Sequence, residues 1–205
     1  PDDFPTKHEV VQYFEDFAEQ ISAPIHCGVE VQNVSRRDGK TGFLVQTSEG
    51  EILADNIVAA TGPFQRPLVP DMVPQSEGVM QIHSTGYRNP EQLPAGAVMV
   101  VGAGSSGSQI ADELRRSGRT VYLSVGPHDR PPRAYRGRDY CWWLGVLGKW
   151  DAAAKEPGTE HVTISVSGAN GGKTIDFRRF ADQGIILTGR ASGYDQGRLQ
   201  FSGDV

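Results

Sequence analysis

The chain has 205 residues, enough for one large domain or two small ones with a substantial core. Its formal net charge is −5, its isoelectric point is near 5.5, and no basic stripe runs along it, so nucleic acid is not expected as a partner. No apolar run approaches a membrane span, no signal peptide opens the chain, and the two cysteines are far apart without a C-x-x-C pair. We therefore expect a cytoplasmic protein without disulfides, and the ends of the chain at Pro1 and Val205 are typical of a fragment or an edited sequence.

The N-terminal region predicts a helix followed by a β-meander. Thr6 and Glu9 fit the S/T-x-x-E capping box, and apolar residues recur at helical spacing as far as Ile21, so we expect an amphipathic helix packed in the core. Short β-type runs follow, with turns at Asp38-Gly39 and Glu49-Gly50 between them. The expected strands cover residues 29–34, 43–47 and 52–54, and a further buried strand is expected at residues 56–60.

Prolines mark the end of this region. Pro67, Pro70 and Pro74 follow one another closely, which predicts a stiff linker and a domain boundary over residues 67–78.

A glycine-rich motif is the most informative feature of the chain. The apolar run 97–101 leads directly into G-x-G-x-x-G at Gly102, Gly104 and Gly107, and a segment with apolar residues on one helical face follows. This strand, turn and helix match the first half of a dinucleotide-binding βαβ unit, in which the cofactor diphosphate lies on the helix N-terminus. The expected cofactor contacts are the three glycines with Ser105 and Ser106. The alternative is a glycine-rich turn between a buried strand and an ordinary helix.

The next strand, residues 120–126, bears on the choice of nucleotide. An NAD site places an acidic residue near the ribose 2′-hydroxyl, about 20 positions beyond the glycines, but here Ser124 takes that place. No Asp or Glu lies between Thr120 and His128, and four arginines follow, among which we take Arg133 as the candidate for a 2′-phosphate. NADPH is therefore favoured over NADH. The alternative for any one of these arginines is a solvated basic loop.

The remaining sequence predicts further α/β elements. An aromatic and basic stretch covers residues 135–150, for which we prefer a helix packed at a domain interface to a substrate pocket. A strand is expected at residues 161–166, a glycine-rich turn at 168–172, a short helix at 177–183 closed by Gly184, and a core strand at 185–188.

With these segments the chain resembles the bacterial flavin-containing monooxygenase-like oxidoreductases, a group that includes the Baeyer–Villiger and the plant auxin-forming enzymes. The resemblance covers most of the chain, and the segments that carry it are Ala60-Thr61-Gly62, residues 83–90, residues 102–107 and residues 132–139. It implies an α/β two-dinucleotide-binding flavoprotein fold, with a Rossmann-like NAD(P)-binding domain and β-meander joined to an incomplete FAD-binding Rossmann-type domain. The implied parts are an FAD-binding portion at 1–66, the linker at 67–78, an NADPH-binding domain at 79–190 and a return towards the FAD domain at 191–205.

The resemblance also implies a function. NADPH passes hydride to FAD, and the reduced flavin activates oxygen on a small organic substrate. Thr61, Gly62 and Val31 are implied to lie near FAD, although Val31 also fits a plain core valine. His83 and Tyr87 are implied to lie at the domain junction near the cofactors, and the alternative for them is a loop that satisfies its own polar groups. No catalytic side chain and no metal site is expected, because the histidines are scattered and the cysteines isolated.

Two departures keep a second function open. Residues 1–96 contain no G-x-G-x-x-G for the FAD diphosphate, and the spacing of Gly78 and His83 differs from the Baeyer–Villiger fingerprint. The alternative function is a truncated NADP(H)-binding module without flavin or catalysis of its own. A dithiol reductase is disfavoured because a redox cysteine pair is absent. The oligomeric state stays open, with a homodimer among the possibilities.

Overall fold

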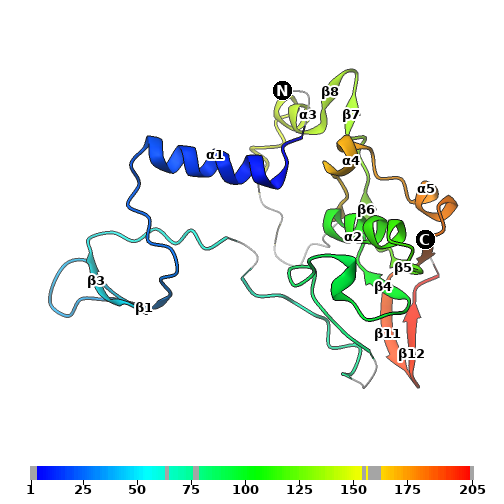
Figure 1. Cartoon of the computed structure of the whole chain (residues 1–205), viewed down its shortest axis with the longest axis horizontal. Helices are drawn as coiled ribbons and strands as arrows, with labels where there is room; N and C mark the ends of the chain where they lie inside the picture. The colour runs from blue at the N-terminus through cyan, green and yellow to red at the C-terminus, as the bar shows by residue number, and fades with distance from the viewer. Residues whose placement is uncertain (1–3, 63–64, 76–78, 154–155, 157–162, 204–205) are drawn as a thin grey trace. The chain divides into compact units, whose positions relative to one another are not determined.

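The computed structural model describes residues 4–62, 65–75, 79–153, 156 and 163–203 (Figure 1). The chain divides into two compact units. We call Pro5–Gln65 the meander unit, and Arg66–Val205 with Pro1–Phe4 the glycine-turn unit. The division after Gln65 lies beside the predicted boundary at residue 66, and the cofactor roles assigned to the two regions stay predictions.

The meander unit has the predicted elements up to residue 54. Helix α1 (Lys7–Gln20) begins at the capping box, in which the Glu9 amide donates to Thr6 Oγ1 at 3.3 Å and the Thr6 amide donates to Glu9 Oε2 at 2.7 Å. Strands β1 (Val31–Arg36), β2 (Phe43–Thr47) and β3 (Gly50–Ala54) form an antiparallel sheet in the order β1-β2-β3.

The prediction that α1 packs in the core is wrong. None of its residues is buried, and Tyr13 and Phe14 are 64% and 60% exposed. The reason is that the described part of this unit buries only Val45 and Thr47, both on β2, and offers no second layer to cover the helix. The apolar stripe therefore predicted correctly that these residues form a helix and incorrectly that the helix is buried.

The strand predicted at residues 56–60 is not formed either. These residues have no regular secondary structure, and Val58 is 88% exposed. A strand needs a neighbour for its backbone hydrogen bonds, and the three paired strands among the described residues of this unit leave the segment without one.

The glycine-turn unit is built on a parallel sheet covered by a helix, as the βαβ motif predicts. Strand β4 (Val98–Val101), helix α2 (Ser105–Arg116) and strand β5 (Val121–Ser124) follow one another, and β10 (Ile186–Thr188) pairs with β5 in the sheet order β10-β5-β4. All three strands run parallel, so their carboxyl ends share one edge of the sheet. In Figure 1, α2, β4 and β5 appear in green.

The core of this unit lies between α2 and the sheet. Ala111 and Leu114 on α2 are fully buried, and they belong to the same apolar cluster as Val121 and Leu123 on β5, which are at most 1% exposed. Burying one such large side chain contributes about 1.5–3 kcal/mol, so this cluster is the main source of stability for the βαβ unit.

Shorter elements complete the unit. The helix predicted at 177–183 and the strand at 185–188 are confirmed as α5 (Phe177–Asp182), which ends before Gly184 at φ +94°, and β10. The predicted turn at 168–172 instead contains a short helix, and residues 161 and 162 of the predicted strand lie outside the described residues. The other elements are η1 (Pro90–Gln92), β6 (His128–Asp129), β7 (Ala134–Tyr135), β8 (Arg138–Asp139), α3 (Tyr140–Val146), β9 (Thr163–Ile164), α4 (Ala169–Gly172), β11 (Ala191–Asp195) and β12 (Arg198–Phe201).

A close approach at Gly107 gives the first testable prediction. A Cβ on Gly107 would lie well inside van der Waals distance of the Gly102 carbonyl oxygen and 3.5 Å from Val100 Cγ1. Gly107→Ala therefore forces α2 away from the turn, and we expect the free energy of unfolding to fall by about 1–3 kcal/mol in urea denaturation. Ser106→Ala, at the exposed neighbouring position, is the control. Equal stability of the two variants would contradict the packing described here.

Candidate functional site

The glycine-rich turn joins β4 to α2 at the carboxyl edge of the sheet. Gly102 has φ +99°, a conformation that side chains rarely adopt, and its amide donates to the Ser124 carbonyl oxygen at 3.1 Å. Gly104 is the N-cap of α2 in an extended conformation, and no side chain in the described structure caps this helix end. The turn therefore presents backbone amides and the positive end of the helix dipole at the sheet edge, a favourable place for an anion.

The two serines of the motif differ in their surroundings. Ser105 Oγ accepts a hydrogen bond from the Val166 amide at 3.1 Å and lies 3.4 Å from the Ile164 carbonyl oxygen. Ser106 is exposed. The Ser105 side chain thus joins the start of α2 to the segment after β9.

A buried pair of hydroxyls holds the same segment, and sequence reasoning missed it because no local pattern marks it. Ser165 is fully buried and Ser108 is 1% exposed, and their oxygens lie 3.0 Å apart. Ser165 Oγ lies 2.7 Å and Ser108 Oγ lies 3.1 Å from the Ala103 carbonyl oxygen. The two serine hydroxyls supply the protons for the hydrogen bonds among these three oxygens, and the bonds clamp the segment after β9 against the glycine turn. No buried side-chain nitrogen or oxygen is left unpaired among the described residues.

Ser124 lies at the end of β5 but is turned inward. It is 2% exposed, its hydroxyl donates to the Gly189 carbonyl oxygen at 3.0 Å, and it accepts from the Ala191 amide at 3.0 Å. Its proton is therefore used within the protein in this structure. Ser124 connects β5 to the chain that follows β10, which is a structural role that the sequence did not indicate.

Arg133 is also engaged within the protein. Its Nε lies 2.8 Å from Asp139 Oδ2, and its guanidinium lies 4.6 Å from the centre of the Phe4 ring. Burial works to raise the pKa of Asp139, but the hydrogen bond from the Cys141 amide and the Arg133 charge outweigh it, so this pKa lies below its ordinary value. The other arginines of this stretch lie over aromatic rings, Arg130 over Phe177, Arg136 over Tyr135 and Arg138 over Trp142.

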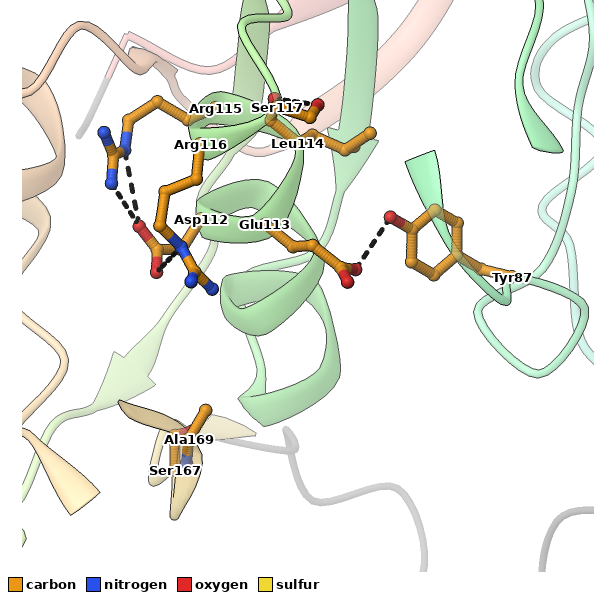
Figure 2. A network of polar contacts seen from close by, with 9 residues as sticks. All are labelled: Tyr87, Asp112, Glu113, Leu114, Arg115, Arg116, Ser117, Ser167 and Ala169. Carbon is orange, nitrogen blue, oxygen red and sulfur yellow. Dashed lines mark hydrogen bonds and ion pairs between the residues drawn. The ribbon is translucent and has the colours of Figure 1, made fainter. Parts of the chain in front are cut away.

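The loop that contains His83 and Tyr87 is closed on itself and tied to α2. His83 Nδ1 accepts from the Thr85 amide at 3.2 Å and lies 2.9 Å from Thr85 Oγ1. The Tyr87 hydroxyl donates to Glu113 Oε2 at 2.8 Å, as Figure 2 shows. The loop is thereby positioned by α2, the same helix that begins at the glycine turn.

The predicted flavin-side residues lie in the meander unit. Val31 is the first residue of β1 and is 58% exposed, which differs from the alternative of a core valine. Thr61 and Gly62 are exposed, and Gly62 has φ +75°. Gln65 Nε2 donates to the Thr61 carbonyl oxygen. These three residues thus belong to a different unit from the glycine turn.

A separate cavity of about 300 Å³ is lined by residues of α2, α5 and the segment before α5. At its edge Asp112 binds both Arg115, at 2.8 Å, and Arg116, at 3.1 Å (Figure 2). Residues 102–107 do not line it, so it is distinct from the site at the glycine turn.

Metal-ligating side chains do not cluster among the described residues. No three histidine, cysteine or acidic side chains among them are grouped closely enough to hold an ion, and Cys27 and Cys141 are both free and exposed. None of the helices in this part of the chain combines the length and the hydrophobicity that a membrane span requires.

The parallel sheet, the glycine turn and the helix N-terminus at the sheet edge have the arrangement of the α/β dinucleotide-binding fold. The family model of the pyridine nucleotide-disulphide oxidoreductases matches residues 1–138, and the chain belongs to this family.

Known proteins agree with this assignment. An uncharacterized CzcO-like oxidoreductase of Geobacillus kaustophilus is 43% identical over 150 residues, covering 72% of this chain and 42% of that protein. The flavin-containing monooxygenase iboF of Amanita muscaria is 31% identical over 118 residues, covering 54% of this chain and 22% of that protein. A flavin monooxygenase structure from Stenotrophomonas maltophilia shares the fold, with a TM-score of 0.64 and 19% identity over 97% of this chain and 52% of that one.

These likenesses confirm two expectations from the sequence. The chain resembles flavin monooxygenase-like oxidoreductases, and its fold is that of the two-dinucleotide-binding flavoproteins. The chain spans less than half the length of the two relatives matched by sequence, covering 42% of the Geobacillus kaustophilus protein and 22% of iboF.

The Tyr87–Glu113 contact gives a prediction that depends on pH. Burial, followed by the hydrogen bond and the charge of Glu113, raises the pKa of Tyr87 above its ordinary value of 10.0. The hydroxyl therefore stabilises the fold fully below pH 10, and this contribution is lost as the pH rises towards the raised pKa. We expect Tyr87→Phe to be about 1 kcal/mol less stable than wild type at neutral pH, with the difference narrowing above about pH 10.

The measurement is urea denaturation of both proteins across this pH range. A difference that stays constant or widens at high pH would contradict the assignment of the raised pKa to Tyr87.

Proposed function

We propose that this chain forms the NADPH-binding part, and a portion of the FAD-binding part, of an FAD- and NADPH-dependent oxidoreductase of the monooxygenase type. The observation that carries the proposal is the N-terminus of α2, which no described side chain caps. It follows Gly102, a glycine of positive φ, at the carboxyl edge of a parallel sheet. Family membership supports flavin-dependent oxidoreductase chemistry. The specific use of NADPH, and of oxygen, is the proposal.

The glycine turn has open space beside Gly102 into which a dinucleotide fits. A Cβ on Gly102 would meet no atom within 4 Å, so the surface there is free for the close approach of a diphosphate. The amides of Ser105, Ser106 and Gly107 are the donors that we assign to that diphosphate, and Gly104 lets it approach the helix end. The Ser108–Ser165 clamp and the Ser105 hydroxyl hold the surrounding backbone in place before the cofactor binds.

The absence of an acidic residue at the end of β5 supports NADPH over NADH. Residues 120–128 hold no carboxylate that would repel a 2′-phosphate. Ser124 enters the proposal as a positioning residue, because its buried hydroxyl is bonded to the backbone on either side of residue 190. Arg133, the candidate that the sequence offers for the 2′-phosphate, is paired with Asp139 in the structure.

For the flavin, the chain supplies only part of a site. Val31, Thr61 and Gly62 are proposed to contact FAD, and His83 and Tyr87 to shape the cofactor-facing loop, in a protein that also contains a G-x-G-x-x-G for the FAD diphosphate. The NADPH and FAD held by these residues would supply hydride transfer and the activation of oxygen towards a small organic substrate. The role of the present residues is to orient the nicotinamide nucleotide and to exclude water.

The alternative is an NADP(H)-binding module without flavin, and one measurement separates the two. We expect a protein that joins this chain to a G-x-G-x-x-G segment for the FAD diphosphate to show a visible flavin absorption band, which NADPH bleaches faster than NADH without oxygen. A colourless protein that binds NADPH would favour the alternative. A protein that binds neither cofactor would refute both.

A matched pair of glycine variants tests the assignment of the cofactor to the turn. Gly102 and Gly197 both have positive φ and open space where a side chain would stand, but Gly197 lies in the β11–β12 turn. Each Ala substitution costs about 1–2 kcal/mol of stability. We expect only Gly102→Ala to weaken NADPH binding, by about tenfold or more in calorimetric titration. Equal affinities of the two variants would contradict the assignment.

A further inference from the structure

Arg190 lies at the carboxyl edge of the sheet, beside the chain that leaves β5. It follows β10 after one intervening residue, Gly189, and its side chain is exposed. Its Cγ and Cδ atoms lie 3.6 Å and 3.7 Å from the position that a Cβ on Gly126 would take. Gly126 is the second residue after β5, so the stem of Arg190 runs along the end of the middle strand of the sheet.

The backbone of Arg190 is fixed by hydrogen bonds on both sides. Ser124 Oγ donates to the Gly189 carbonyl oxygen and accepts from the Ala191 amide, each at 3.0 Å, so one buried hydroxyl spans residue 190. The Arg190 amide donates to Ser202 Oγ, and the Arg190 carbonyl oxygen accepts from the Ser202 amide, each at 2.9 Å. This part of the edge is therefore rigid, which lowers the entropic cost of using the side chain to bind a ligand.

The position matches the ribose of a bound dinucleotide. A nucleotide whose diphosphate lies on the turn after β4 extends its adenosine ribose towards the carboxyl end of the neighbouring strand, which is β5 here. Gly126 has no side chain to separate the Arg190 stem from that place. A guanidinium is planar, permanently charged and able to bind a phosphate through two parallel hydrogen bonds.

Arg190 is preferred to the other basic candidates because of its position at the end of β5. Arg133 is paired with Asp139 at 2.8 Å, and Arg130 lies 3.9 Å from Asp176 and over the Phe177 ring. The stem of Arg190 lies against the end of β5, beside the expected place of the ribose.

We propose that Arg190 binds the 2′-phosphate of NADPH and sets the preference of this site for NADPH over NADH. The inference rests on the proposed nucleotide site at the glycine turn. Arg190 reaches the cofactor from β10, whereas the sequence pointed to the arginines that follow β5. Ser124 acts through Arg190 as a positioning residue.

The test compares two small ligands that differ only by the phosphate in question. Adenosine 2′,5′-bisphosphate and adenosine 5′-monophosphate are titrated into the full chain by calorimetry. We expect wild type to bind the bisphosphate about ten- to a hundredfold more tightly, the range of a charge-assisted contact. Arg190→Gln is expected to remove this preference and leave the affinity for the monophosphate unchanged, and Arg190→Lys to retain part of it.

Arg198→Gln, which removes the same charge from the exposed strand β12, is the control and is expected to keep the wild-type preference. An Arg190→Gln variant that keeps the preference, or that loses affinity for both ligands equally, overturns the assignment of Arg190 alone. A wild-type chain that binds neither ligand overturns the proposed nucleotide site and this inference together.

Discussion

Helix α2 can lie against the glycine-rich turn only because Gly107 has no side chain where the helix meets the Gly102 carbonyl oxygen. That contact sets the height of the helix above the sheet, and with it the burial of Ala111 and Leu114 in the core. It also brings the first amides of α2 to the carboxyl end of β4, where they can bind an anion. One steric constraint therefore determines both the stability of the βαβ unit and the position of its candidate cofactor site.

Buried serine hydroxyls then attach distant segments to this framework. Ser108 on α2 meets Ser165, which lies 57 positions later in the chain, and Ser124 on β5 meets residues 65 and 67 positions later. A hydroxyl suits this role because it is small and can both donate and accept. The result is a sheet edge at which the glycine turn, the end of β5 and Arg190 are held by the protein before any ligand binds, and such preorganisation favours affinity.

The sequence predicted what depends on local pattern and missed what depends on long-range contacts. The G-x-G-x-x-G spacing, the strands of the meander and the C′ glycine at Gly184 were all readable, because each reflects a local backbone requirement. The exposure of α1 could not be predicted in this way, because amphipathicity shows that a helix has an apolar face but not whether the chain covers that face. The sequence position of Ser124 predicts a cofactor ligand, and only the structure shows its hydroxyl turned towards residues 189 and 191. Arg190 could not be found from sequence spacing, because the sheet order alone brings it beside Gly126.

The edge formed by β4, β5 and β10 is the place at which we propose that NADPH binds. Amide hydrogen–deuterium exchange of the purified chain, with and without saturating NADPH, tests this most directly because it locates the ligand along the backbone. We expect slower exchange on binding in residues 102–108, in the residues that follow β5, and around residue 190. Unchanged exchange in residues 102–108, with protection elsewhere in the chain, would contradict the proposed site.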